Sequence, residues 1–220
     1  MLINFDLMER VVLDTEKMDW SPSPLAGVER RMLDREGEES GRATTVVRFA
    51  PDSFFSPHTH TGGEEFLVLE GTFSDEMGDF GPGMYVRNPI GSTHQPHSKD
   101  GCTIFVKLCQ MDERDQEIVR INTRNTPWHP GMVDGLSVMP LHSFGEENVA
   151  LVKWQPGTRF NPHSHPGGEE ILVLEGTFED EQGVYPEGSW IRNPPGSFHK
   201  PWSTEGCTIY VKTGHLATER

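Results

Sequence analysis

Short runs of apolar residues alternate along the chain with clusters of glycine, proline and charged residues, and long helical periodicity is absent. The apolar runs are rich in Val, Ile, Thr and Phe, which is typical of an all-β protein with many tight turns. Phe66–Leu69 is apolar on both faces, which favours a strand buried inside a sandwich or barrel. In the first half the pattern predicts strands at Val28–Leu33, Thr44–Phe49, Phe54–His60, Glu64–Thr72, Met84–Asn88 and Cys102–Leu108.

The second half of the chain repeats the first. HTHTGGEEFLVLEG (58–71) and HSHPGGEEILVLEG (163–176) are identical at eleven of fourteen positions, at an offset of 105 residues. Residues 81–94 and 186–199 match at the same offset, whereas WSPSPLAG (20–27) and WHPGMVDG (128–135) match at an offset of 108. A three-residue indel in a turn explains the difference. We therefore predict two homologous domains, residues 1–112 and 113–220, with the boundary in the charged stretch Met111–Glu117.

Histidines and one glutamate recur at equal spacing in both halves. Residues i and i+2 of a strand point to the same face, so His58 and His60 project together. The glycines of the following turn let Glu64 face the same space, and His94 could close the site from a neighbouring strand. The second half supplies the corresponding set: His163, His165, Glu169 and His199.

These residues form a ligand set for a divalent metal. A lone His-x-His pair is more often an exposed strand pair, but six of the ten histidines occupy the repeated positions. We therefore predict one divalent metal per domain, and the donors accept zinc, iron(II), manganese, nickel or cobalt. Alternation places Glu65 and Glu170 on the opposite face, in a supporting role. The repeated Arg-Asn-Pro segments at 87–89 and 192–194 are interpreted as turn-setting.

The repeated blocks resemble the two sequence motifs of the cupin superfamily. The first half carries them from His58 to Gly71 and from Gly83 to His94, and the second half carries both again. The resemblance implies an all-β fold of two tandem double-stranded β-helix (jelly-roll) barrels, with the metal in each barrel mouth. The duplicated apolar strands further predict that the halves pack on each other within the chain as a cupin dimer would, and further oligomerisation stays open.

A narrower resemblance is to the ChrR-type cupin domain. It is carried by TGGEE or PGGEE before the apolar strand, by VRNPIGSTH and by EGCTIYVK. That domain forms the C-terminal half of zinc-binding anti-sigma factors, which restrain extracytoplasmic-function (ECF) sigma factors. The resemblance implies zinc at His58, His60, Glu64 and His94, and a zinc-dependent sensor or regulatory module in transcriptional stress response. Those proteins also carry a helical N-terminal zinc domain that binds the sigma factor. This sequence begins almost at once with a cupin half, so an ECF sigma factor would be regulated by another route or with another chain.

An enzyme is the alternative function. An iron(II) centre with a vacant position can bind O₂ and a chelating substrate. Similar cupins cleave β-dicarbonyls, and related bicupins oxidise flavonols or aromatics, so the resemblance also implies a dioxygenase acting on a small dicarbonyl or phenolic substrate. The halves differ at the strand leading to the histidines, where Arg159 and Asn161 replace Phe54 and Ser56. Arg159 and Asn161 could bind an anionic ligand if they face inward, or they lie at the rim in water; one site could then be catalytic and the other structural.

Cysteines and charge limit the remaining choices. Cys102 and Cys207 recur in both halves and are candidate redox thiols, although a small buried hydrophobe is the simpler interpretation. Three cysteines without a CxxC pair fit a reducing compartment. The net charge of −15 disfavours direct nucleic-acid binding. The N-terminus has no basic segment and no apolar run approaches about 20 residues, so we expect a cytoplasmic protein without a membrane segment.

Overall fold

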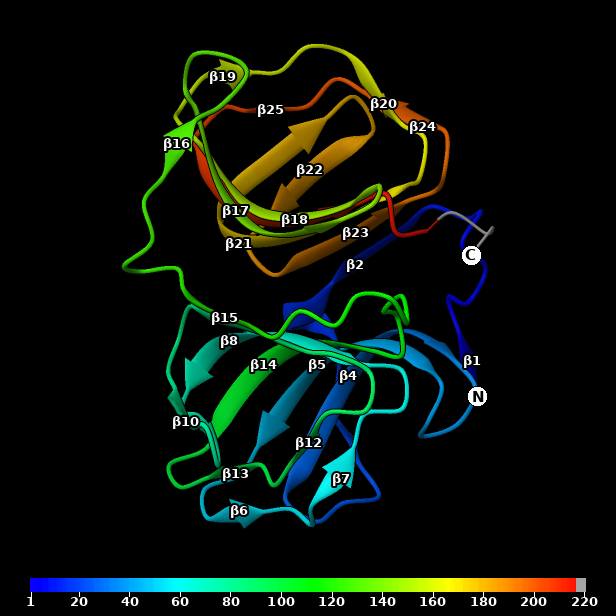
Figure 1. Cartoon of the computed structure of the whole chain (residues 1–220). Helices are drawn as coiled ribbons and strands as arrows, with labels where there is room; N and C mark the ends of the chain where they lie inside the picture. Colours follow the sequence, from blue (N-terminus) through cyan, green and yellow to red (C-terminus); the bar gives the residue numbers. More distant parts are fainter. Residues whose placement is uncertain (217–220) are drawn as a thin grey trace. The chain divides into compact units, whose positions relative to one another are not determined.

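The computed structural model describes residues 1–216 and consists of two compact units (Figure 1). The N-terminal unit contains Met1–Phe5 and Met18–Asn125, and the C-terminal unit contains Asp6–Lys17 and the chain from Thr126 onward. Within residues 1–216 the helical structure is one short 3₁₀ turn, η1 (Thr15–Lys17), so the all-β prediction is confirmed. No helix in this part of the chain is long and apolar enough to cross a membrane.

The N-terminal unit is built from antiparallel strands. Its main sheet has the order β1-β4-β5-β14-β8-β11-β15, with β3 on β4, and smaller sheets pair β10-β9-β13-β6 and β12-β7. The strands are β1 (Leu2–Ile3), β3 (Ser21–Pro22), β4 (Val28–Glu36), β5 (Arg42–Phe49), β6 (Ser53–Phe54), β7 (His58–Thr59), β8 (Glu64–Gly71), β9 (Phe73–Asp75), β10 (Gly78–Phe80), β11 (Met84–Asn88), β12 (Thr93–His94), β13 (His97–Ser98), β14 (Cys102–Leu108) and β15 (Val119–Asn122).

The C-terminal unit has the same plan. Its main sheet has the order β16-β17-β18-β26-β21-β23-β2, the far end of β21 pairs β22 and β25, β25 also pairs β19, and β20 pairs β24. The strands are β2 (Val11–Asp14), β16 (His129–Pro130), β17 (Leu136–Phe144), β18 (Glu147–Trp154), β19 (Thr158–Arg159), β20 (His163–His165), β21 (Glu169–Asp180), β22 (Gly183–Pro186), β23 (Ser189–Asn193), β24 (Ser197–His199), β25 (Trp202–Ser203) and β26 (Cys207–Thr213).

Each main sheet ends on a strand taken from the other half of the sequence. β2 pairs with β23 in the C-terminal unit, and β15 pairs with β11 in the N-terminal unit. The two segments are repeat equivalents, because the hydroxyls of Thr15 and Thr123 donate to the carbonyls of Gly188 and Gly83 at the same distance of 2.7 Å. The predicted bounds 1–112 and 113–220 leave β2 with the first domain and β15 with the second. A sequence repeat does not say which sheet edge a short strand will complete.

Each unit has its own core between the sheets. In the N-terminal unit the core contains Phe55, Phe66, Phe73 and Phe80, and the rings of Phe66 and Phe73 lie 4.7 Å apart. In the C-terminal unit the corresponding cluster contains Trp154, Ile171, Phe178 and Tyr185. Phe55 and Phe66 come from the predicted strands, whereas Phe73 and Phe80 lie on β9 and β10, which the pattern did not predict.

One predicted strand is interrupted. The pattern predicts a continuous strand at Phe54–His60, but β6 ends at Phe54 and β7 begins at His58, with three non-strand residues between them. The second half has the same break between β19 and β20. Pro57 and Pro162 lie in these breaks and cannot donate a ladder hydrogen bond. The two-residue alternation therefore does not carry through the break to the histidines.

Gly71, the last residue of β8, and Gly176, within β21, are glycine for a steric reason. Both have positive φ, 67° and 73°, and both follow closely on the register shift against the neighbouring strand. A Cβ on Gly71 would collide with the carbonyl oxygen of Gly101 and would lie 2.8 Å from the Cα of Cys102. Glycine is thus required by both the backbone angle and the close approach of β14.

We expect Gly71→Ala to destabilise the protein much more than Gly91→Ala. Gly91 also has a positive φ of 86°, but a Cβ there would meet no atom within 4 Å. Gly91→Ala should therefore cost only the left-handed backbone penalty of about 1–2 kcal/mol, whereas Gly71→Ala must also move a strand. Urea unfolding of both variants in the presence of chelator measures the difference, and equal losses would show that the approach of β14 is not limiting.

Candidate metal centres

Three histidines and a glutamate meet in the N-terminal unit. His58 on β7 lies directly opposite His94 on β12, and His60 follows β7 by one residue. The ring nitrogens of the three histidines lie within 4.8 Å of one another, and Nε2 of His60 is 3.0 Å from Nε2 of His94. Glu64, the first residue of β8, places Oε2 3.4 Å from Nε2 of His60 and 3.6 Å from Nε2 of His94. The structure thus brings together the four residues named from the sequence.

The C-terminal unit repeats this arrangement. His163 and His165 lie on β20, and His163 is directly opposite His199 on β24. Nε2 of His199 is 3.1 Å from Nε2 of His165 and 3.3 Å from Nε2 of His163. Glu169 begins β21, with one oxygen 3.4 Å from Nε2 of His165 and the other 3.7 Å from Nε2 of His199.

The donor atoms fit a divalent metal. Metal–nitrogen bonds of about 2.1 Å hold neighbouring nitrogens about 3.0–3.4 Å apart for right-angle to tetrahedral geometry, and the observed spacings fall in this range. Nδ1 of His163 faces the carbonyl of Asn161 at 2.9 Å and Nδ1 of His58 faces that of Ser56 at 3.2 Å. Each of these Nδ1 atoms therefore carries the proton, and the Nε2 lone pairs point at one another, an arrangement that a shared cation stabilises.

Two of the three imidazoles in each centre differ in their proton affinity. Burial lowers the pKa of His60, and burial together with the neighbouring histidines lowers the pKa of His165 to about 3. Burial also acts to lower the pKa of His94, but its hydrogen bond with Asp75 and the charge of Glu64 outweigh burial and raise it. His199 follows the same balance with Asp180 and Glu169. Each centre thus contains an imidazole whose pKa burial lowers and one whose pKa a neighbouring carboxylate raises.

The carboxylates behind His94 and His199 are functional residues that the sequence reasoning missed. Nδ1 of His94 lies 3.1 Å from Oδ2 of Asp75, which orients the ring and leaves Nε2 for the metal. Asp180 stands 3.8 Å from Nδ1 of His199; the same oxygen lies 3.5 Å from Nη2 of Arg10, and the other accepts a 2.7 Å hydrogen bond from Tyr185, a position occupied by phenylalanine in the first half. A signal was available: the repeat continues past the glycine as GTFSDE and GTFEDE.

Asn88 and Asn193 do more than set a turn, so that interpretation is corrected. The buried amide of Asn88 donates to Oε2 of Glu64 at 2.9 Å, and Asn193 donates to Oε2 of Glu169 at the same distance. The arginine of the same segment, Arg87, forms buried ion pairs with Glu65 and Asp115. Glu65 therefore points away from the histidines, as the strand alternation predicts.

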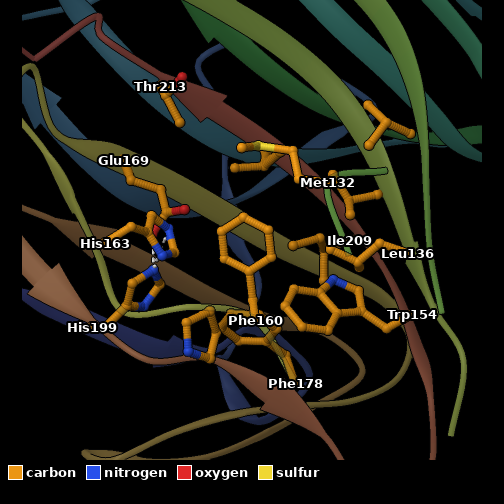
Figure 2. A pocket seen from close by; sticks show the side chains of 14 residues that line it. Met132, Leu136, Trp154, Phe160, His163, Glu169, Phe178, His199, Ile209 and Thr213 are labelled. Carbon is orange, nitrogen blue, oxygen red and sulfur yellow. Dashed lines mark hydrogen bonds and ion pairs between the residues drawn. The ribbon is translucent and has the colours of Figure 1, made fainter. Parts of the chain in front are cut away.

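A cavity of about 200 Å³ lies beside the C-terminal centre. His163, Glu169 and His199 gather at one end of it, and the ring of Phe160 lies between them and the apolar end (Figure 2). Phe160 also touches the ring of His163 edge-on, with centroids 4.8 Å apart. The apolar end is formed by Met132, Leu136, Trp154 and Ile209. This arrangement places a small apolar space directly against two of the three histidines.

Arg159 and Asn161 do not line this cavity. Both are exposed, and the guanidinium of Arg159 lies over the ring of Trp202, 5.4 Å from its centroid. The break between β19 and β20 reverses the alternation, so Phe160 faces the cavity instead of its two neighbours. Of the two alternatives for Arg159, the structure thus favours the rim position. Asn161 acts through its backbone carbonyl, which faces His163.

Cys102 and Cys207 have the environment of small buried hydrophobes. Both lie in the apolar cores, and burial raises the pKa of each thiol to about 11. A thiol with this pKa is almost entirely protonated at neutral pH, and the thiolate is the reactive form. This disfavours the redox-thiol interpretation of both residues.

An all-β barrel that gathers three histidines and a glutamate defines a cupin with a candidate metal centre. The sequence profile of the ChrR cupin-like domain matches residues 8–112 and again residues 116–217. The chain therefore belongs to the family of ChrR cupin-like domains, which it contains twice. No protein of the curated collection of characterised sequences matches it.

Solved structures share the fold over nearly the whole chain. A Nostoc punctiforme protein provisionally named a dioxygenase has a TM-score of 0.80 at 16% identity, over 95% of this chain and 84% of that one. Escherichia coli YlbA has a TM-score of 0.74 at 15% identity, over 100% and 96%. Lactobacillus farciminis oxalate decarboxylase, solved with formate, has a TM-score of 0.65 at 12% identity, over 93% and 86%. Structural likeness at such low identity establishes the shared fold alone. The activity has to be inferred from the site.

We expect His60→Ala and His165→Ala each to lower the metal content of the purified protein from two equivalents to one, and the double variant to contain none. Each substitution removes a nitrogen that its centre places against His94 or His199. Elemental analysis measures the content, and the exposed His129→Ala is the matched control. Full occupancy in the double variant would contradict the assignment. Loss of a metal should also lower the unfolding temperature, because binding is coupled to folding.

We expect only Cys109 to react with an aromatic disulfide reagent at pH 8 in the folded protein. Burial raises the pKa of all three thiols, but Cys109 is only half-buried, whereas Cys102 and Cys207 are buried and have a pKa of about 11. The released chromophore should therefore correspond to one thiol before unfolding and three after it. In Cys109→Ser the fast reaction should vanish, and a remaining fast thiol would restore Cys102 or Cys207 as a redox candidate.

Proposed function

We propose that this protein is a metal-dependent cupin enzyme whose working centre lies in the C-terminal barrel. The observation that carries the proposal is the cavity against His163, Glu169 and His199. Ligand sites are concave, mostly apolar and supplied with a few convergent polar groups, and this cavity has that composition. In the proposal the metal supplies a site for O₂ and for the chelating oxygens of a substrate. The apolar walls hold the rest of the substrate and exclude water.

The volume of the cavity limits the substrate. An apolar cavity of about 150 Å³ is known to hold one benzene molecule, so about 200 Å³ suits a single ring or a short branched chain. A three-ring flavonol is too large. The substrate class proposed is therefore a one-ring phenol or a short β-dicarbonyl, whose oxygens approach the histidine end while the apolar part lies toward Trp154 and Ile209.

A zinc-dependent regulatory module is the second candidate, and the family match over both halves favours it. Three imidazoles and a carboxylate satisfy four-coordinate zinc without an open position. In this proposal the partner is an ECF sigma factor, and the metal maintains the fold of the surface that it recognises. The cavity has no role in this alternative. The two candidate functions therefore differ in whether a substrate binds in the cavity.

We expect protein purified under nitrogen, without chelators or nickel affinity, to contain iron and to consume O₂ with catechol or acetylacetone but not with quercetin. Val152 lines the cavity and is only partly buried, so Val152→Phe should fill the space and abolish uptake without disturbing the histidines. Val152→Ala, which enlarges the same space, is the matched control and should retain uptake.

Elemental analysis and an oxygen electrode provide both measurements. Two zinc per chain with no O₂ uptake by the iron-reconstituted protein would reject the enzyme and favour the regulatory module. Equal uptake by Val152→Phe and Val152→Ala would show that the substrate does not occupy this cavity.

A further inference from the structure

The glutamate of each centre is held by an asparagine whose other end is held by an arginine. Arg120 donates from Nη2 to Oδ1 of Asn88 at 2.5 Å, and Arg10 donates from Nε to Oδ1 of Asn193 at 2.9 Å. The amide group of each asparagine in turn donates to Oε2 of Glu64 or Glu169. Each centre thus contains a chain of three side chains, from arginine through asparagine to glutamate.

The arginine determines which way the asparagine points. An amide has an acceptor end and a donor end, and a guanidinium can only donate. With Arg10 bound to Oδ1, the amide nitrogen of Asn193 must face the carboxylate of Glu169. Glu169 is buried beside the histidines, and its Oε2 accepts the amide hydrogen bond of Asn193. The arginine therefore fixes the orientation of the asparagine amide and, through it, the rotamer of the carboxylate.

Both arginines arrive on the exchanged strand segments. Arg120 lies within β15, opposite Val86, whereas Arg10 immediately precedes β2. Because Thr15 and Thr123 are equivalent, Arg10 corresponds to residue 118 and not to Arg120. Two arginines from unequal positions of the repeat thus make the same contact. Each also lies over the equivalent ring, Arg10 over Tyr185 and Arg120 over Phe80, at 5.6 Å in both cases.

Duplication of a single arginine does not account for both contacts, because the two arginines occupy different positions of the repeat. A structural feature copied by duplication would use the same position twice, as the histidines do. Here the asparagine–glutamate pair is copied, but the arginine is supplied independently in each unit. The contact that the two arginines share is the hydrogen bond to Oδ1 of the asparagine, and Arg10 in addition pairs with Asp180 and donates to the hydroxyl of Tyr185.

We propose that Arg10 is a positioning residue for the C-terminal metal centre and Arg120 is one for the N-terminal centre, each acting through its asparagine on the metal-binding glutamate. The proposal rests on the metal binding proposed above. We call this assignment crossed, because each arginine supports the metal site of the other half of the sequence. Arg10, near the start of the chain, supports the C-terminal site, and Arg120, at the start of the second repeat, supports the N-terminal site.

Single-site forms of the full chain test the crossed assignment. His60→Ala leaves only the C-terminal site, and His165→Ala leaves only the N-terminal site. In the first background Arg10→Met should weaken zinc binding about 10–100-fold, the usual effect of losing a group behind a metal ligand, and in the second it should change nothing. Arg120→Met should give the reverse pattern. Competition with a chromophoric chelator measures each affinity.

Controls separate positioning from folding. Lys17→Met and Arg124→Met change exposed cations in the same two segments and should leave both affinities unchanged. Arg10→Lys keeps a donor and a charge, so it should recover part of the affinity lost in Arg10→Met. The visible spectrum of bound cobalt(II) should change with Arg10→Met and shift back with Arg10→Lys, because it reports the carboxylate at the metal.

Each outcome decides the proposal. Equal weakening of both sites by Arg10→Met, or weakening of the N-terminal site alone, would overturn the crossed assignment. Unchanged affinity and spectrum in every arginine variant would overturn the positioning role while leaving the metal sites intact. Absence of zinc binding in the His60→Ala and His165→Ala parents would overturn the proposed metal centres themselves, and the positioning role with them.

Discussion

The structure depends on bringing three imidazole nitrogens and a buried carboxylate to one point in each barrel. Lone pairs that face one another across 3.0–3.3 Å repel, and an ionised carboxylate buried beside them is costly in the absence of a positive charge. A divalent cation relieves both costs at once. The surrounding groups serve this convergence: backbone carbonyls and aspartates orient the rings, and asparagines hold the glutamates. The barrel supplies the short paired strands, β7 with β12 and β20 with β24, on which the histidines stand opposite one another.

The exchanged strands connect the architecture to this chemistry. A sheet edge at β11 or β23 presents unpaired backbone groups, and pairing with β15 or β2 satisfies them. The same segments deliver an arginine to the asparagine at the end of each edge strand. Edge protection and support of the glutamate are therefore provided by one short segment. A strand of only four residues therefore has both a structural role and a role at the candidate metal site in each unit.

Duplication preserved the candidate metal ligands and let the surroundings diverge. Asp180 is bound by Tyr185 and Arg10 and lies 3.8 Å from His199, whereas Asp75, with Phe80 in place of the tyrosine, lies 3.1 Å from His94. Ile171 occupies the position where the N-terminal barrel has Phe66, whose ring packs on Phe73. Such changes are tolerated because the ligand positions depend on strand pairing and turn glycines, while the interior depends on volume. Two copies of one centre can thus acquire different tasks.

The sequence by itself determined the all-β fold, the repeat and the set of eight ligand candidates, because these follow from local alternation and from equal spacing of chemically distinctive residues. It did not determine which residue faces the cavity: Pro57 and Pro162 break the strands, and the break turns Phe160 inward and Arg159 outward. It did not place Arg10 or Arg120, because no local pattern states which sheet edge a four-residue strand will complete. Contacts that join residues 10 and 193 depend on chain topology, and only the tertiary structure decides them.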